Sequence, residues 1–518
     1  MSQITLAHPR SIRIKGLNQP WIVWAGMVPV FLVCLPVIYV LVRTGQIGVL
    51  GAWQELFRTR NLELLVNTLT LVVGVTTLAA SIGLAVAWCI ERTNLVGRNF
   101  WRVAASLPLA VPAFVASYSW ASIDISFQNM AGAIMVLALS KYPLVYLPVA
   151  AALRSTDPGF EDVSRSLGRG PWKTFTSALL PQLLPALGGG SLLVATHMFA
   201  EFGALALLRV QTFTTAIFET YELQFDSSTA AMQSAVLMLL CVPVALFEMR
   251  MRRGRRVARV GRGNARQPRI IKLGRLTPVV LLGLALLGFL SLGVPLGRLM
   301  YWLISGHSAG NGYTDILPAV MGSLRLAGMG ALLTGALAIP LVLLATRYRG
   351  RMAQVADRLP YIVHGLPGVV VALALVFLTI RVVPFMYQSV FVLLIAYAIL
   401  FLPLGQSSLR ASIELVPANI EPIARSLGKR PFYVFITVVL PNIAPGVGAA
   451  LALMMLEMVR ELTATLMLAP TGTITLATEV WAYTSDAEYA AAAPFATLLV
   501  LLSVIPVWVF TKRMLHQA

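Results

Sequence analysis

Four ionisable side chains lie in otherwise apolar stretches of this sequence, in two pairs with helical spacing. They are His197, Glu201, Glu457 and Glu461. A spacing of four residues places both members of a pair on one face of a helix. Ionisable groups in apolar helices usually face a cavity or a partner. Two interpretations stay open: contact with a polar solute, or structural pairing in which Glu457 or Glu461 neutralises Arg460 or Arg325.

Acidic and tyrosine side chains follow each of these stretches. They are Glu219, Tyr221, Glu222 and Asp226 in one region, and Glu479, Tyr483, Asp486, Glu488 and Tyr489 in the other. At a constant offset of 260 residues, Glu219 matches Glu479 and Asp226 matches Asp486. Oxygen ligands suit hard, highly charged cations, but no fixed ligand cluster is visible from the spacing and the metal ligands stay unknown. A docking surface for another protein is the alternative, formed by Glu219, Tyr221, Asp226, Glu479, Tyr483 and Asp486.

Membrane-spanning helices must position these groups. Hydrophobic residues make up 58% of the 518 residues and charged residues 12%, against roughly 25% charged in soluble domains. An uncharged run of about 20 residues can cross a bilayer as a helix. We expect an all-α polytopic membrane protein with about twelve spans. They are residues 21–43, 64–90, 103–123, 129–153, 182–208, 229–247, 276–303, 316–346, 359–380, 382–409, 441–468 and 489–511.

The distribution of basic residues predicts the topology. With the N-terminus inside, the inner segments hold 31 of the 40 Lys and Arg residues and the outer loops hold five. This asymmetry follows the positive-inside rule and predicts that both termini are cytoplasmic. A signal peptide is the alternative for the first apolar run, but no small-residue cleavage site stands out. The net charge of +19 therefore needs no nucleic-acid partner, and the basic linker 249–275 could rest on anionic membrane lipid.

The linker separates two similar halves. We expect a first six-helix unit at 1–248 and a second at 276–518, related as a parallel repeat. The segments 161–181 and 421–441 share nine identical residues at an offset of 260. Pro112 and Pro367 also correspond, at a slightly smaller offset.

The repeated segment has the helix-starting and helix-ending residues expected of a short cytoplasmic helix joined to a span. Glu161 and Arg165 form an i,i+4 pair, and Gly168 is suited to the left-handed position after a helix. Pro171 suits the first turn of a second helix, and Pro181 marks the entry into the next span. The second copy repeats these elements with Glu421, Arg425, Gly428, Pro431 and Pro441. An ordinary amphipathic loop helix is the alternative.

These segments resemble a known motif. Glu161…Gly168…Leu180-Pro181 and its second copy are similar to the Glu-Ala-Ala…Gly…Leu-Pro motif of permeases in binding-protein-dependent ABC importers, although both copies lack the paired alanines. In that family the motif forms a coupling helix that sits in a groove of the ATP-binding subunit. The resemblance implies the type I importer fold, a periplasmic binding protein and two copies of the ATPase subunit. It also implies a bacterial inner (plasma) membrane location.

The chain is expected to be a transport subunit without a catalytic site. It has no G-x-x-x-x-G-K-[ST] phosphate loop, so ATP-Mg is expected only in the partner subunits and no cofactor in this chain. The fused halves, with Arg460-Glu461-Leu462-Thr463-Ala464 and Ala200-Glu201-Phe202-Gly203-Ala204, resemble ferric-iron permeases. Thiamine, polyamine and phosphonate permeases are the alternatives. A twelve-span secondary transporter would leave the repeated module unexplained.

The resemblance also implies how transport proceeds. ATP-driven movement of the two coupling helices would open the bundles outward, and hydrolysis would reset them. His197, Glu201, Glu457 and Glu461 are the candidate residues of the translocation path.

Overall fold

Helices make up the fold. The computed structural model describes residues 20–156, 159–252, 270–306, 314–348, 350–363, 365–416, 426, 428 and 431–516. Within these ranges no β-strand occurs, and an isolated parallel bridge joins Thr93 to Ile271. The predicted all-α class is confirmed.

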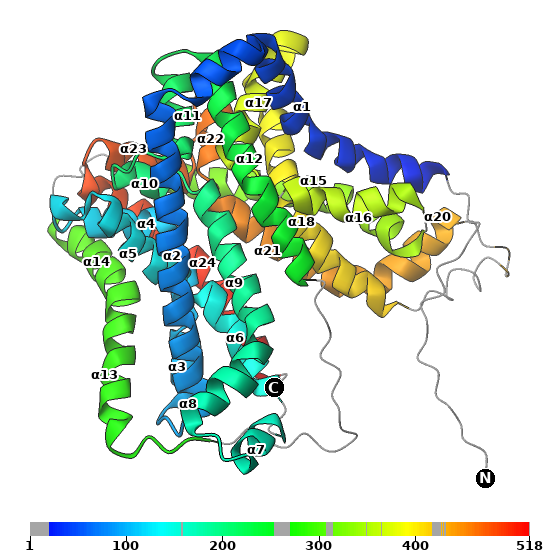
Figure 1. The fold of residues 1–518 in the computed structure, drawn as a ribbon. Coiled ribbons are helices and arrows are strands. Elements are labelled where there is room, and N and C mark those ends of the chain that lie inside the picture. Colours follow the sequence, from blue (N-terminus) through cyan, green and yellow to red (C-terminus); the bar gives the residue numbers. More distant parts are fainter. Residues whose placement is uncertain are drawn as a thin grey trace. The chain divides into compact units, whose positions relative to one another are not determined.

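The first repeat combines long apolar helices, such as α2, with several short helices (Figure 1). They are α1 (Pro20–Leu56), α2 (Thr59–Arg92), α3 (Arg98–Ala104), α4 (Ala113–Ala121), α5 (Met130–Lys141), α6 (Pro143–Ser155), α7 (Gly159–Ser166), α8 (Pro171–Thr174), α9 (Leu180–Ala200), α10 (Gly203–Leu207), α11 (Phe213–Glu222) and α12 (Ser227–Arg252).

The second repeat follows the same order. Its helices are α13 (Thr277–Gly288), α14 (Val294–Ser305), α15 (Ile316–Arg347), α16 (Arg351–Val363), α17 (Gly368–Val382), α18 (Val390–Leu415), α20 (Pro431–Val434), α21 (Leu440–Val459), α22 (Thr463–Leu468), α23 (Leu476–Ser485) and α24 (Tyr489–His516).

Several expected spans are bent or broken. Among the described residues, eight helices are long and apolar enough to cross a membrane, or ten if two bent pairs each count as one span. The predicted count of twelve is therefore not confirmed. The expected span 103–123 bends by 86° between Ala110 and Ala113, where Val111 caps the first helical segment and Pro112 precedes α4. Proline lacks the N–H that a continuous helix would need.

Two further expected spans end early. Residues 182–208 were predicted as one helix, but α9 ends at Ala200 and α10 begins at Gly203. In the second repeat, 441–468 is interrupted between Val459 and Thr463. Both interruptions contain a glutamate, and neither contains a proline.

The chain divides into two compact units, and each unit takes segments from both sequence repeats. The smaller unit comprises Met1–Tyr39, Leu324–His364 and Val371–Gly472. The larger unit comprises Val40–Ser323, Gly365–Val370 and Thr473–Ala518. The boundary of the sequence repeats at 249–275 stays a prediction, and residues 253–269 of that linker lie outside the described residues.

Glycines allow close helix packing in the larger unit. A Cβ on Gly83 of α2 would lie 2.9 Å from the Tyr146 nitrogen of α6. A Cβ on Gly190 of α9 would lie 2.8 Å from the α-carbon of Val145, also on α6. Helices α2, α6 and α9 therefore pack with their backbones close together, and this three-helix core supports the segment that connects α6 to α9.

Candidate functional site

The first repeated segment, residues 159–181, forms two short helices and a π-helical turn that leads into α9. Helix α7 ends at Ser166, and Gly168 follows with φ +76°. Its N–H donates to the Arg165 carbonyl at 2.9 Å. Pro171 begins α8, Phe175–Leu179 forms a π-helical turn, and Pro181 lies in the first turn of α9. The predicted roles of Gly168, Pro171 and Pro181 in the backbone are confirmed.

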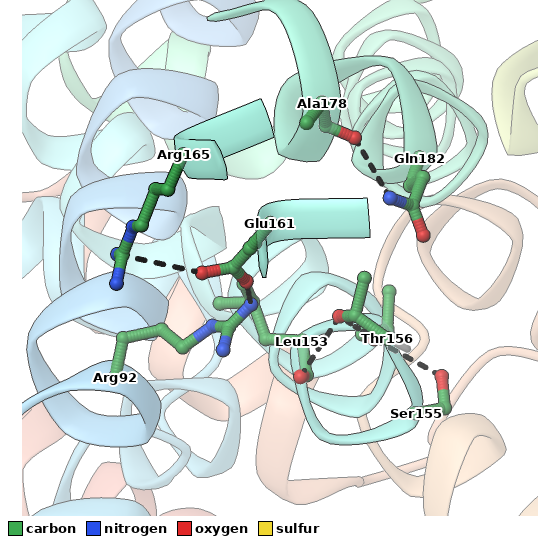
Figure 2. Close-up of polar contacts among 9 residues, drawn as sticks. Arg92, Leu153, Ser155, Thr156, Glu161, Arg165, Ala178 and Gln182 are labelled. Carbon is green, nitrogen blue, oxygen red and sulfur yellow. Dashed lines mark hydrogen bonds and ion pairs between the residues drawn. The ribbon is translucent and has the colours of Figure 1, made fainter. Parts of the chain in front are cut away.

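An ion-paired glutamate attaches α7 to the end of α2. Arg92 Nη2 donates to Glu161 Oε1, and Arg165 Nη2 lies 3.8 Å from Glu161 Oε2 (Figure 2). The Arg92 side chain is 2% exposed and that of Glu161 10% exposed. Because buried charges are costly unless paired, Glu161 fixes the buried face of α7 against α2. The predicted Glu161–Arg165 pair is confirmed, and the shorter contact to Arg92 was missed.

Four apolar side chains of this segment are exposed, beside the exposed polar residues Asp162 and Ser166. Phe160, Val163 and Leu167 are 46%, 61% and 68% exposed, at helical spacing, and Trp172 is 76% exposed. Ser164 on the opposite face is buried and donates to Thr174 Oγ1 at 3.3 Å. We call Phe160, Val163, Leu167 and Trp172 the exposed apolar face. Exposed large apolar side chains gathered on one short segment make it a candidate interaction site.

The described residues of the second copy have the same turn and helix starts as the first copy. Gly428 has φ +75°, and a π-helical turn at Phe435–Val439 precedes α21. Pro441 lies in the first turn of α21, as Pro181 does in α9. Glu421 and Arg425 lie outside the described residues. The π-helical turns were not predicted, although Phe175 and Phe435 are among the identical positions.

The glutamates of the interrupted spans accept backbone hydrogen bonds. Glu201 Oε1 accepts from the Ala204 N–H at 3.2 Å, and Glu461 Oε1 accepts from the Ala464 N–H at 3.0 Å. Each carboxylate thus satisfies a free N–H at the start of a short helix. The expected shared helical face was wrong, because Glu201 and Glu461 both lie beyond the end of the preceding helix.

The other two candidates differ from each other. Glu457 pairs with Arg460, as the structural interpretation predicted. His197 is exposed on the last turn of α9. Both interrupted helices therefore combine a glutamate at the break with a second ionisable group one turn earlier.

The outer acidic residues mostly serve local structure. Asp226 accepts from the Ser228 and Thr229 N–H groups at 3.1 Å each, capping α12. Hydrogen bonds from the Thr229 hydroxyl and from Ser228 lower the pKa of Asp226 below its ordinary value. Glu219 accepts from Gln211 Nε2 at 2.8 Å. Tyr221 lies on α11.

The corresponding residues of the second repeat have a different environment. Burial, with the nearby Asp315 charge, raises the pKa of Glu479. Tyr483 stacks on Phe495 at 5.7 Å between ring centroids, and Asp486 ends α23.

The expected pairing of these acidic residues across the repeats was wrong. Thr212 and Thr475 form equivalent capping boxes, so α11 and α23 correspond at an offset of 263. Three additional residues in the second repeat shift Glu479 away from Glu219 and Asp486 away from Asp226.

Two ion pairs near the helix ends were also missed. Arg102 of α3 contacts Glu91 through two nitrogens, at 2.6 and 3.0 Å. Asp357 of α16 pairs with Arg410 of α18. These residues follow or end apolar runs, and a search for charges at equal offsets in both repeats would have found Arg102 and Asp357. No group of three or more His, Cys, Asp or Glu suited to a metal occurs in the described part of the chain.

Comparison with known proteins agrees with the repeated architecture. The family described as "Binding-protein-dependent transport system inner membrane component" matches residues 79–257 and again 338–512. The Haemophilus influenzae protein "Fe(3+)-transport system permease protein FbpB 2" is 45% identical over 483 residues, covering 92% of this chain and 95% of that protein. The Escherichia coli "Sulfate transport system permease protein CysT" is 30% identical over 141 residues, covering 24% of this chain and 51% of that protein.

Proposed function

Because the chain belongs to the family of binding-protein-dependent transport system inner membrane components, we propose that it is the permease of an ABC importer for ferric iron. The observation that carries the substrate is the 45% identity to an Fe(3+)-transport permease over nearly the full length of both chains. Similarity to the sulfate permease covers only part of one repeat. Thiamine, polyamine and phosphonate stay as alternative substrates.

We propose that ATPase subunits act on the two cytoplasmic segments. The exposed apolar face of the first segment supports this role. Covering Val163, Leu167 and Trp172 with another protein removes apolar surface from water, which favours binding. The duplicated Gly168 and Gly428 turns support one ATPase copy for each segment. ATP-Mg then binds in those partners, and this chain transmits movement without a catalytic site of its own.

A periplasmic binding protein supplies the substrate in this proposal. It docks on the outer loops that contain α11 and α23, where Tyr221 and Tyr483 are located. The positive-inside distribution supports cytoplasmic termini.

Ferric iron is proposed to pass Glu201 and Glu461. Both lie at breaks within apolar spans, and each is half-buried rather than enclosed. Carboxylate oxygens suit a hard, highly charged cation. His197 and Glu457 lie one turn earlier and complete the proposed path residues.

Transport follows from alternating access. ATP binding draws the ATPase subunits together, the cytoplasmic segments move with them, and the attached helices α9 and α21 carry the movement into the membrane. The π-helical turns before these helices are places where a helix can adjust its register. Hydrolysis returns the transporter to the inward-open state.

Uptake of radiolabelled ferric iron tests the proposal. Iron-starved cells with and without the gene are compared, with thiamine, putrescine and sulfate measured in parallel. Loss of iron uptake alone, restored by the intact gene, is the expected result. Normal iron uptake with loss of another substrate would reject ferric iron and keep the permease assignment.

A further inference from the structure

The end of α2 is held from two sides. On one side Arg92 pairs with Glu161 of α7. On the other, the segment Ile271–Leu273, near the end of the basic linker 249–275, runs beside Thr93 and Asn94. The Ile271 N–H donates to the Arg92 carbonyl at 2.8 Å, and the Asn94 N–H donates to the Ile271 carbonyl at 3.1 Å. The Leu273 N–H adds a bond to Asn94 Oδ1 at 2.8 Å.

We propose that Arg92 is a positioning residue that joins the coupling helix α7 to α2, and that Ile271–Leu273 is a strap that holds Arg92 in place. The proposal rests on the proposed function of α7. Glu161 faces the protein while Val163 and Leu167 face outward, so the Arg92–Glu161 pair is not part of the exposed apolar face. It connects the docking helix to a span that packs against α6 and α9.

The burial of the pair makes this connection specific. Arg92 is among the largest fully buried side chains, and the Glu161 carboxylate is 10% exposed. An ion pair taken out of water has a strongly preferred geometry, because separating the charges leaves the buried Arg92 guanidinium without its carboxylate partner. A displacement of α7 by the ATPase is therefore expected to displace the end of α2.

Through the strap, the linker also contributes to the connection between α7 and α2. Two of its three hydrogen bonds involve the backbone of Arg92 and Asn94, so they depend little on the side chains of the strap. Through this pairing, the connection between the two repeats is attached to the backbone of the residue that contacts α7.

The experiment uses the complete importer in proteoliposomes, with the ATPase subunits and the iron-loaded binding protein. Iron transported per ATP hydrolysed is measured for the wild type and for Arg92→Gln, Arg92→Lys and the double variant Arg92→Gln/Glu161→Gln. The double variant leaves no buried charge without a partner and guards against a simple folding defect. We expect the iron-to-ATP ratio to fall about tenfold in Arg92→Gln and in the double variant, since a displacement of about 1 Å can cost up to a hundredfold in a coupled step. Arg92→Lys keeps one cationic donor and is expected to recover most of the ratio.

The strap is tested with a matched pair of prolines. Ile271→Pro removes the N–H that binds the Arg92 carbonyl, and Ile270→Pro changes the preceding residue, whose N–H makes none of these three bonds. We expect a lower iron-to-ATP ratio only in Ile271→Pro. A wild-type ratio in both the double variant and Ile271→Pro would overturn the inference while the proposed function stands. Absence of ATP-dependent iron uptake by the wild type would instead reject the proposed function.

Discussion

The two repeats keep the same backbone turns but pair their charges differently. Gly168 and Gly428 have φ +76° and +75°, and each is followed by a π-helical turn and a proline-initiated span. Arg102 and Asp357 are 255 residues apart, like Pro112 and Pro367, yet they have opposite charges. Arg102 contacts Glu91 at the end of α2, whereas Asp357 contacts Arg410 on α18.

This difference distinguishes backbone geometry, which both repeats share, from charge pairing, which differs between them. A left-handed turn can be formed without penalty only by glycine and a few other residues, so both copies have the same solution. A charged residue can pair with a different residue in each repeat, as long as every buried charge has a partner of opposite sign. We infer that both repeated segments require the turn geometry, and that the charge pairs stabilise each half separately.

The largest expected effect is at the left-handed turns. Gly168→Val places a β-branched residue at φ +76°, where L-residues lose roughly 1–2 kcal/mol, although nothing lies within 4 Å of the added Cβ. Iron uptake should fall about tenfold while ATP hydrolysis continues, because the strain is relieved by moving α7 rather than by unfolding the bundle. The same result is expected for Gly428→Val. Gly168→Asn is the control, because asparagine tolerates this conformation. An equal loss of iron uptake in the Asn and Val variants would reject backbone strain as the cause.

The two ion pairs should differ in their contribution to stability. The Glu91 side chain is 2% exposed, so Glu91→Ala leaves Arg102 without its main partner and should cost on the order of 3 kcal/mol. Asp357 and Arg410 are 33% and 28% exposed, and Asp357→Ala should cost about 1 kcal/mol or less. The midpoint of thermal unfolding, measured for each purified variant in detergent, shows which substitution destabilises the protein more. A larger shift for Asp357→Ala would contradict the comparison.

Two glycines of corresponding spans provide a smaller contrast. Gly190→Ala brings a methyl group within 2.8 Å of the α6 backbone and should destabilise by roughly 1–3 kcal/mol. Gly448→Ala meets nothing within 4 Å and should be neutral or stabilise by up to about 1 kcal/mol. The same unfolding measurement tests both. Destabilisation by Gly448→Ala as large as that by Gly190→Ala would reject the close packing of α9 on α6.

The smallest effects concern the outer acidic groups, which have opposite pH dependence. The pKa of Asp226 is lowered by its hydrogen bonds, so its contribution to stability is present above its ordinary pKa and is lost as pH falls through the folded-state value. The pKa of Glu479 is raised by burial, so its ionised form opposes folding as pH rises above its ordinary value. Asp226→Asn should lower the unfolding midpoint at pH 7, and Glu479→Gln should raise it. The Glu479→Gln difference should shrink between pH 7 and pH 5; a difference that grows would contradict this sign.

The sequence predicted the parts of the fold that depend on local residue types. Gly168, Pro171 and Pro181 have backbone roles that any chain with these residues would favour, and the long apolar runs identified α2, α15 and α18. It did not predict the breaks after Ala200 and Val459, because neither interruption contains a proline and apolar residues resume directly after the charged ones.

The contacts of the candidate site depended on the tertiary structure. Glu161 was expected to pair with Arg165 on its own helix, but Arg92 lies 69 residues earlier and reaches it only because the fold brings the end of α2 to α7. The constant offset of 260 failed for Glu219 and Glu479 because an insertion precedes α23, and only the matching capping boxes reveal it.

The most direct test of the account is whether an ATPase subunit contacts the exposed apolar face. A photo-crosslinking amino acid is placed at Val163 of α7, which is 61% exposed, and at Val73 of α2, which is 62% exposed within an apolar span. After illumination of the assembled importer, crosslinks to the ATPase subunit are detected by mass. We predict a crosslink from position 163 and none from position 73. An importer that transports iron with ATP but gives no crosslink at 163, or equal crosslinks at both positions, would contradict the role of this cytoplasmic segment.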